Sequence, residues 1–586
     1  MVASPLLVAV LAGFWILLCG FSLTDEAEEK AEFVEGLKRD IIKVDHSIEV
    51  TKDLIKKSRN APYMPDIIFR LAELYVEKSR LVYYLEVETK GAEQAVNSPE
   101  AKLLKNEAIQ TYLDLMKRFP DYRYNDKVLF FLGHEYYELG MHQDMLDTYK
   151  KLVEDYPKSP LVLEALFIVG DYYFNKDDLA EAEKWYRKIL RYRESPIHDM
   201  ARYKLGWVAI NKAKDDKKYW KVALKLFEQV ATSTNTPDEG VSVDTHKMVN
   251  IRLEAINGVV FCYTEVYPAR NALEYFRKLA GSKQVYLHAL EKLANRYFIK
   301  DQFDNAAMIY RRIIDLSNDV EKNLEYAQRV YDAASLTKNK EKVDEDVAAL
   351  VKAASLYTYS WRIPDEEKKK LEKEFEVYAR DIVTKLHLLA KKRNERRAFR
   401  VAARAYKNYL SFFTNTEKLQ EMKLNYAEAL YQSRKYLESA RIYEDVARHM
   451  KDSNERRDTL YSAIQSYQMA LGDAKFLSRF ELVETRQALK QLGALYIRKY
   501  PRDKHVPTIK FNVARMFFEM GEYKQAIESF LEYIKQYPND ANVPIAGHLV
   551  LDCYKQLEDY RGLARQGRAF LSDPKIKFEK FKKEVA

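Results

Sequence analysis

Apolar residues recur at three- and four-residue intervals in the stretch 511–538, which reads FNVARMFFEMGEYKQAIESFLEYIKQYP. This is the period of one face of an α-helix, and no run of strict alternation competes with it. Gly521 favours a break between two helices, because glycine weakens a helix interior and suits the left-handed turn that follows one. Pro538 ends the second helix, since proline has no N–H to donate. The stretch therefore predicts a helical hairpin.

The same template occurs repeatedly along the chain. When the small residue of the first helix is taken as zero, apolar or aromatic residues follow at positions three, twelve, sixteen and nineteen. The clearest copies begin at Gly133, Gly170, Ala294, Ala427 and Ala514. Looser copies begin at Ala72, Gly206, Gly258 and Ala390, and the one at Gly206 regains the pattern at Phe227 after a short insertion. Small residues would let two antiparallel helices approach closely, and a period near 36 residues indicates stacked repeats.

The rhythm of small, aromatic, alanine, aromatic and proline residues resembles tetratricopeptide (TPR) repeats, over most of the chain between Met64 and Pro574. The resemblance implies an all-α fold, an α-solenoid of about ten helical hairpins that form a right-handed superhelix without a sheet. Tyrosine outnumbers phenylalanine, 43 to 27. We expect tyrosine rings to fill the space between helices, with the hydroxyl reaching the solvent edge.

The repeats and the composition shifts predict a division into six segments. These are a signal or membrane anchor (1–24), an N-terminal helical segment (25–63), an N-terminal TPR array (64–353), a charged helical connector (354–384), a C-terminal TPR array (385–574) and a basic tail (575–586).

The N-terminus contains nineteen uncharged residues, Pro5 to Leu23, followed by an acidic run. Such a stretch fits a short membrane span or a secretory signal. Cys19 is a candidate for lipidation, as in bacterial lipoproteins, although Leu18 stands where a small residue is needed and no Lys or Arg precedes the segment. A buried apolar helix is the alternative. The first three interpretations predict an extracytoplasmic, periplasmic and membrane-anchored protein.

The sequence offers no constellation of catalytic residues, no metal-binding spacing and no phosphate-binding loop, so we expect no enzyme activity, no metal and no cofactor. His198 and Asp199 are interpreted as a helix cap and a surface residue. Cys262 and Cys553 lie among apolar residues and are expected to be small buried hydrophobes.

Positive charge is concentrated between Leu389 and Lys407, whereas the net charge of the whole chain is only +9. A basic patch of this kind could attract phosphate, lipid headgroups or an acidic partner, and a solvated helical face is the simpler interpretation. Its members are Lys391, Lys392, Arg393, Arg396, Arg397, Arg400 and Arg404.

A second apolar stripe runs one residue further round the first helices of three repeats. In TPR proteins this flank lines the concave groove that receives peptides, so we expect partner binding there; the alternative is packing against the adjacent repeat. The aromatic stripe consists of Phe130, Tyr137, Phe167, Phe174, Tyr203 and Trp207.

These features favour a non-catalytic scaffold that binds other envelope proteins or peptides, with its N-terminus in a membrane. In style the chain resembles outer-membrane assembly lipoproteins and TPR proteins associated with gliding motility. The alternative is a nucleic-acid-associated helical-repeat protein that uses the basic patch around Lys391–Arg404. The N-terminal segment argues against it, so a nucleic-acid partner is not favoured.

Overall fold

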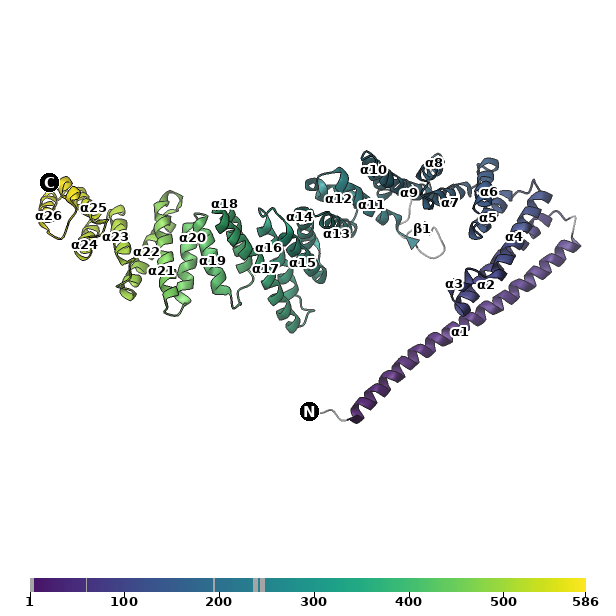
Figure 1. The fold of residues 1–586 in the computed structure, drawn as a ribbon, viewed down its shortest axis with the longest axis horizontal. Helices are drawn as coiled ribbons and strands as arrows, with labels where there is room; N and C mark the ends of the chain where they lie inside the picture. The colour runs from purple at the N-terminus through teal and green to yellow at the C-terminus, as the bar shows by residue number, and fades with distance from the viewer. Residues whose placement is uncertain (1–4, 59–60, 193–194, 235–240, 243–247) are drawn as a thin grey trace. The chain divides into compact units, whose positions relative to one another are not determined.

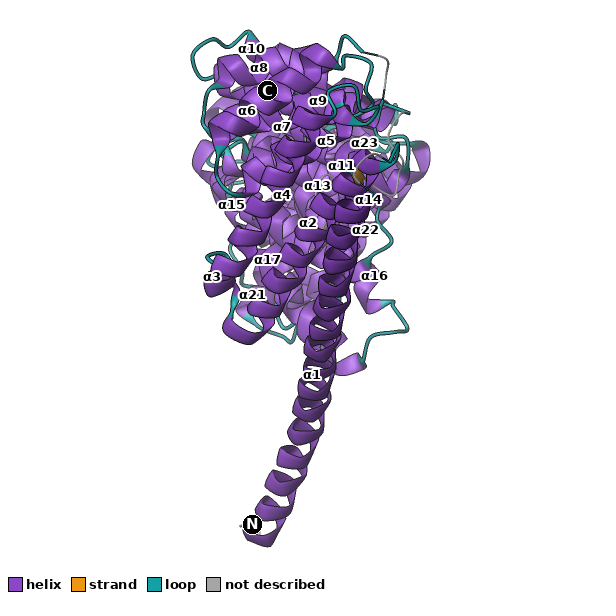
Figure 2. Ribbon diagram, turned by 90° about the vertical axis from the view of Figure 1, so that its right-hand side faces the viewer, coloured by secondary structure: helices purple, strands orange, loops and turns teal. Residues whose placement is uncertain are grey.

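The computed structural model describes residues 5–58, 61–192, 195–234, 241–242 and 248–586, with the backbone alone for 5–29, 241–242 and 248–249. Nearly all of the described chain is helical (Figures 1 and 2). Two strands of two residues, Val241–Ser242 (β1) and Met248–Val249 (β2), pair antiparallel between α10 and α11. This ladder is the one exception, within the described part of the chain, to the expected absence of a sheet.

The chain divides into two compact units, Met1–Tyr267 (unit 1) and Pro268–Ala586 (unit 2). Unit 1 contains the helices α1 (Pro5–Lys57), α2 (Met64–Lys90), α3 (Ala92–Ala95), α4 (Pro99–Arg118), α5 (Asn125–Glu138), α6 (His142–Asp155), α7 (Val162–Asn175), α8 (Leu179–Ile189), α9 (Pro196–Lys212), α10 (Tyr219–Ala231) and α11 (Ile251–Val266).

Unit 2 begins with a 3-10 turn at Ala269–Asn271, and a second one spans Ala474–Phe476. Its helices are α12 (Ala272–Leu279), α13 (Lys283–Ile299), α14 (Phe303–Leu316), α15 (Val320–Leu336), α16 (Val343–Thr358), α17 (Asp365–Arg393), α18 (Arg396–Leu410), α19 (Leu419–Gln432), α20 (Tyr436–His449), α21 (Asn454–Gly472), α22 (Arg479–Lys499), α23 (Val506–Glu519), α24 (Tyr523–Gln536), α25 (Val543–Gln556), α26 (Tyr560–Ser572) and α27 (Glu579–Val585).

Within each unit, a helix packs mainly against its neighbours in the sequence, as expected for an α-solenoid. The predicted small residues explain how the paired helices approach. A Cβ added at Gly133 would lie 2.7 Å from the ring of Tyr149, and one added at Gly170 would lie 2.7 Å from the ring of Tyr186. Position zero and position sixteen of the template are therefore in direct contact, which confirms the interpretation of the spacing.

The ring of Phe227 has two glycine neighbours. A Cβ at Gly206 would lie 2.6 Å from this ring and a Cβ at Gly258 would lie 2.7 Å from it, and the ring is fully buried. Gly258, which begins one of the looser copies of the template, therefore contacts the ring of the preceding hairpin. One side chain from α10 thus joins α9 and α11.

Tyrosine rings fill the repeats in the predicted way. The rings of Tyr149, Tyr186 and Tyr533 are fully buried. The Tyr533 hydroxyl donates to Asp540 Oδ1 at 2.5 Å. Burial and this carboxylate raise the pKa of Tyr533. The expectation that the ring is packed and the hydroxyl reaches a polar edge is confirmed at this site.

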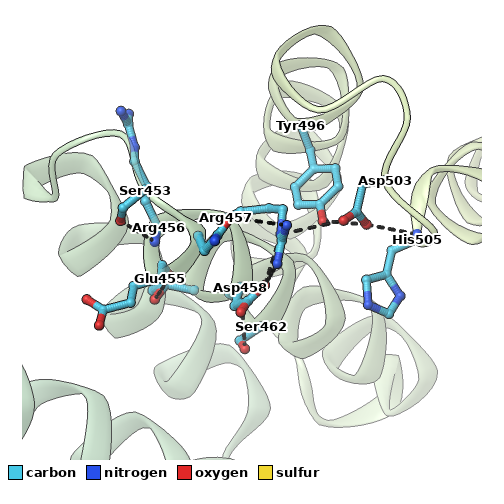
Figure 3. A network of polar contacts seen from close by, with 11 residues as sticks. Ser453, Glu455, Arg456, Arg457, Asp458, Ser462, Tyr496, Asp503 and His505 are labelled. Carbon is cyan, nitrogen blue, oxygen red and sulfur yellow. Dashed lines mark hydrogen bonds and ion pairs between the residues drawn. The ribbon is translucent and has the colours of Figure 1, made fainter.

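A second tyrosine–carboxylate contact, with more partners, joins α21 to the connection between α22 and α23 (Figure 3). Tyr496 donates to Asp503 Oδ1 at 2.9 Å, and the backbone N–H of His505 donates to the same oxygen at 2.9 Å. Arg457 lies 3.5 Å from the other Asp503 oxygen, and the His505 ring stacks on Tyr461 at 3.7 Å between centroids. The carboxylate of Asp503 therefore fastens one hairpin to the next.

Two predicted segments have a definite place in unit 2. The expected connector, residues 354–384, lies inside this unit, and α17 packs against α16 and α18. The expected basic tail, residues 575–586, contains α27, whose Phe581 is 2% exposed. The Phe581 ring lies 2.2 Å from the position that a Cβ would take at Gly547. The last repeat is thus covered by a ring that comes from beyond it.

Among the residues with described side chains, no helix combines the length and the apolar character that crossing a bilayer requires. The apolar stretch Pro5–Leu23 and the candidate Cys19 lie outside those residues.

Candidate partner-binding surface

The aromatic stripe lies on the first helices α5, α7 and α9, but two of its rings are inside the hairpins. Phe130 is 7% exposed and Phe167 is 5% exposed. Phe130 packs on Tyr149 with centroids 6.0 Å apart, and Phe167 packs on Tyr186 at 5.7 Å. The expectation that they line a groove is therefore corrected.

Tyr203 and Trp207 are half-buried on α9. Both rings meet Phe227 edge-on, at 5.6 Å and 5.9 Å. Trp207 also lies 6.4 Å from Phe261 of α11. At these two positions the stripe therefore contributes to packing between neighbouring repeats.

Tyr137 and Phe174 are the members of the stripe with the most open surroundings. Tyr137 is 44% exposed, and Phe174 is half-buried beneath the ammonium group of Lys204, 5.3 Å from the ring centroid. Lys204 pairs with Asp171 at 3.0 Å, and Asp171 also accepts a hydrogen bond from Tyr186. This polar network fixes Lys204 over the stripe between α7 and α9.

A cavity of about 460 Å³ opens beside the stripe, between α2, α4 and α5. α5 contributes His134 and Glu138 to its wall, and Tyr137 precedes Glu138 on this helix without lining the cavity. The other side is lined by the rings of Tyr83 and Tyr84 and by Ala95, Val96 and Ser98, which lie between α2 and α4. Cavities with aromatic walls and a few convergent polar groups are typical of binding sites.

The polar groups at this cavity are only partly paired. Lys105 donates to Glu138, and burial lowers the pKa of Lys105. Glu135, beside His134 in the sequence, is 2% exposed and does not line the cavity, and its Oε2 has no hydrogen-bond partner among the described residues. His134 Nδ1 also lacks one and lies 3.8 Å from Glu135 Oε1. A buried polar atom without a partner is costly, so this site is suited to a group that would supply the missing contact.

The cavity could not be read from the sequence as a unit. Its residues come from positions 79–84, 95–105 and 134–139, three segments that are separated in the sequence and meet in the fold. The one sequence signal for this cavity was His134, which lies one helical turn after Phe130, a member of the aromatic stripe.

The predicted basic patch is exposed, but its charge is partly neutralised. Arg404 makes two contacts with Asp344, at 2.6 Å and 3.1 Å, and Arg397 pairs with Glu341 at 3.0 Å. Lys391 pairs with Glu428 at 2.8 Å. Arg396 donates to the carbonyl oxygen of Ser433 at 3.1 Å. The remaining members, Lys392, Arg393 and Arg400, are exposed and have no ion pair among the described residues.

His198 caps α9 together with Ser195, as predicted, but Asp199 is fully buried and is not a surface residue. Asp199 pairs with Arg202 at 3.0 Å and accepts from the Ser233 hydroxyl, which fixes α9 against the end of α10. Cys262 and Cys553 are buried, as predicted, and burial raises the pKa of the Cys553 thiol to about 12.

Comparison with protein families agrees with the geometry. Two family models described as tetratricopeptide repeats match the chain, one over residues 132–197 and the other over residues 510–540. These two stretches are therefore similar to tetratricopeptide repeats. The first match covers the TPR hairpins that bear Tyr137 and Phe174, and the second covers the hairpin of α23 and α24. No curated protein is significantly similar to the chain.

Proposed function

We propose that this TPR protein is a non-catalytic scaffold of a bacterial cell envelope, which binds a partner protein through unit 1. TPR arrays are in general protein–protein interaction modules, and their all-α fold is typically non-catalytic. The cavity between α2, α4 and α5 carries the proposal, because it combines aromatic walls with the buried Nδ1 of His134, which has no hydrogen-bond partner among the described residues. Tyr137 extends this surface along α5.

The chemistry of the cavity limits what can bind. An apolar or aromatic side chain of the partner would pack on Tyr83 and Tyr84, and a polar group of the partner would pair with His134 Nδ1. An extended segment that leaves the cavity would continue past Tyr137 toward Phe174. Rings in such positions carry much of the energy of peptide interfaces.

Substitution at the open positions tests this surface. Tyr84→Ala and Tyr137→Ala should each weaken partner binding by more than about 1 kcal/mol, because each removes a partly exposed ring from the interface. Binding would be measured by calorimetry with a partner identified by crosslinking in the native organism. Tyr560→Ala is the matched control, since Tyr560 is 67% exposed and lies in unit 2. Unchanged affinity in both variants would refute the proposed site.

The envelope location rests on the apolar segment Pro5–Leu23. Deletion of residues 1–24 should release a soluble, folded protein from the membrane fraction, because the repeats are expected to begin only at Met64. Fractionation and circular dichroism would measure this. A truncated chain that is unfolded, or a full chain that fractionates with soluble proteins, would contradict the proposal. A role in outer-membrane assembly or in a motility complex is the more specific form of this proposal.

A further inference from the structure

One end of the helices in unit 2 carries a line of cations. Successive helices run in opposite directions, so every second connection lies at the same end (Figure 1). The connection after α17 touches the connection after α15, through Arg397 and Glu341, and the connection after α19, through Arg396 and the Ser433 carbonyl. The connection after α21 follows in the same alternation. These four connections are named the basic edge.

The cations of the basic edge exceed the carboxylates available to them. Its exposed Lys and Arg residues are Lys338, Lys342, Lys391, Lys392, Arg393, Arg396, Arg397, Arg434, Lys435, Lys475 and Arg479. Among the described residues, Lys392, Arg393 and Arg434 form no ion pair. Arg434 projects from a backbone with φ of 67°, so it stands at the tip of the turn between α19 and α20.

Two phenylalanines at the end of the basic edge are exposed to solvent. Phe476 is 76% exposed and Phe480 is 78% exposed, on either side of the start of α22. Val483, one turn further along α22, is 57% exposed. Lys475 and Arg479 flank the rings, and the Lys475 ammonium lies 5.0 Å from the Phe476 centroid. Such rings are costly in water, and cations beside them are typical of segments that enter a lipid headgroup layer.

We propose that the basic edge of unit 2 binds the surface of an anionic phospholipid membrane, with Phe476 and Phe480 inserted among the headgroups. Charge complementarity identifies the occupant, because cations on successive turns match a surface of distributed negative charge. The cations stand on the connections and on the helix ends beside them. Of these cations, Lys342 lines a described cavity and the others do not, an arrangement that suits a flat surface. This inference concerns unit 2 and does not depend on the binding surface proposed in unit 1.

The opposite end of the same helices supplies a control. The connection between α16 and α17 exposes Tyr359 at 80% and Trp361 at 85%, so its rings are at least as open. The first turn of α17, however, contains Asp365, Glu366 and Glu367. An anionic surface would repel these carboxylates. Exposed rings alone therefore do not distinguish the two ends. Arg362 lies 5.3 Å from the Trp361 centroid, so the opposite end is marked by the three carboxylates in the first turn of α17 and not by a lack of cations.

Hydrogen exchange on the full-length chain tests the proposal locally, so that binding through the N-terminal segment does not obscure the result. The protein would be mixed with vesicles of phosphatidylcholine alone or with equal parts of phosphatidylcholine and phosphatidylglycerol. Anionic vesicles should slow the exchange of residues 473–484, because the first-turn amides of α22 would leave water. High salt should remove the effect. Equal protection by neutral vesicles, or none by anionic vesicles, would overturn the proposal.

Variants separate the contributions of charge and rings. The triple variant K392E/R393E/R434E should weaken the protection by at least about tenfold in lipid concentration, because each cation near the surface contributes to attraction. F476S/F480S should abolish protection of 473–484 while leaving the melting temperature unchanged. K369E/K370E and Y359S/W361S are the matched controls, which should behave as the parent chain. Protection by a single-stranded RNA oligonucleotide in place of anionic vesicles would overturn the membrane assignment in favour of nucleic acid.

Discussion

The three repeats of unit 1 that begin with glycine and the clearest repeats of unit 2 pair their helices with different small residues. In unit 1, Gly133, Gly170 and Gly206 lie directly against a ring, at distances that a Cβ could not occupy. In unit 2, the same template positions hold Ala294, Ala427 and Ala514, all fully buried, so a methyl group separates backbone and ring. Glycine returns at Gly547, where the ring comes from α27. The same repeat pattern therefore allows two distances between the helix backbone and the ring packed on it. We expect substitutions of the small residue to be tolerated differently at the two distances.

Removal of the central ring should produce the largest effect in both units. Phe227→Ala and Phe530→Ala should each lower the free energy of unfolding by roughly 3–5 kcal/mol, because each empties a fully buried ring site. Urea unfolding followed by circular dichroism would measure both. Since Phe227 contacts two hairpins, its variant should be at least as destabilised; a smaller loss than in Phe530→Ala would show that Gly206 and Gly258 collapse onto the vacancy.

Substitution of the small residues tests the comparison directly. Gly170→Ala should cost roughly 1–3 kcal/mol, because the added methyl would meet the buried ring of Tyr186. The reverse change in unit 2, Ala514→Gly, should cost only about 1 kcal/mol, from the lower helix propensity of glycine. Gly36→Ala, at a helical glycine with no neighbour within 4 Å, is the control and should be neutral or stabilising. Equal costs for Gly170→Ala and Gly36→Ala would contradict the close approach.

Along the aromatic stripe, stability effects should decrease with exposure. Phe167→Ala should cost roughly 3 kcal/mol because its ring is buried on Tyr186, whereas Tyr137→Ala should change the free energy of unfolding by less than about 0.5 kcal/mol. Trp207→Ala should fall between them, since Trp207 packs on Phe227 and Phe261. Thermal melts of the three variants would rank them, and a nearly unchanged melt for Phe167→Ala would restore it to the candidate groove.

The two buried cysteines allow the opening of the two units to be compared with little change to the sequence. Cys262 lies in unit 1 and Cys553 in unit 2, and both thiols are buried. In a variant with Cys19→Ser, neither thiol should react with a maleimide until its own unit opens, because burial removes access and raises the pKa of Cys553 to about 12. Pulse labelling across a urea gradient, read by mass spectrometry, would give one transition per thiol. Rapid labelling without urea would contradict the packing of either unit.

Sequence spacing predicted the repeats because a helix face fixes which residues meet within one hairpin. Gly133 and Tyr149 are sixteen positions apart and do touch. Spacing did not predict the burial of Phe130, because the direction of a side chain does not reveal what covers it. Likewise, seven cations were visible between Lys391 and Arg404, but their partners Glu341, Asp344 and Glu428 lie at distant positions on other helices. The cavity was missed for the same reason, since three separated segments build it.

The tyrosine filling sets an alkaline limit on the fold. Burial raises the pKa of Tyr263 to about 12 and that of Tyr310 to about 12, and it also raises the pKa of Tyr186. In the unfolded chain these phenols would ionise near pH 10. Since the folded state keeps the proton longer, the stabilisation is complete below about pH 10 and is lost as the pH rises toward about 12. Phenolate absorbance should therefore appear in two stages, first from exposed tyrosines and then abruptly from the buried ones as the repeats come apart.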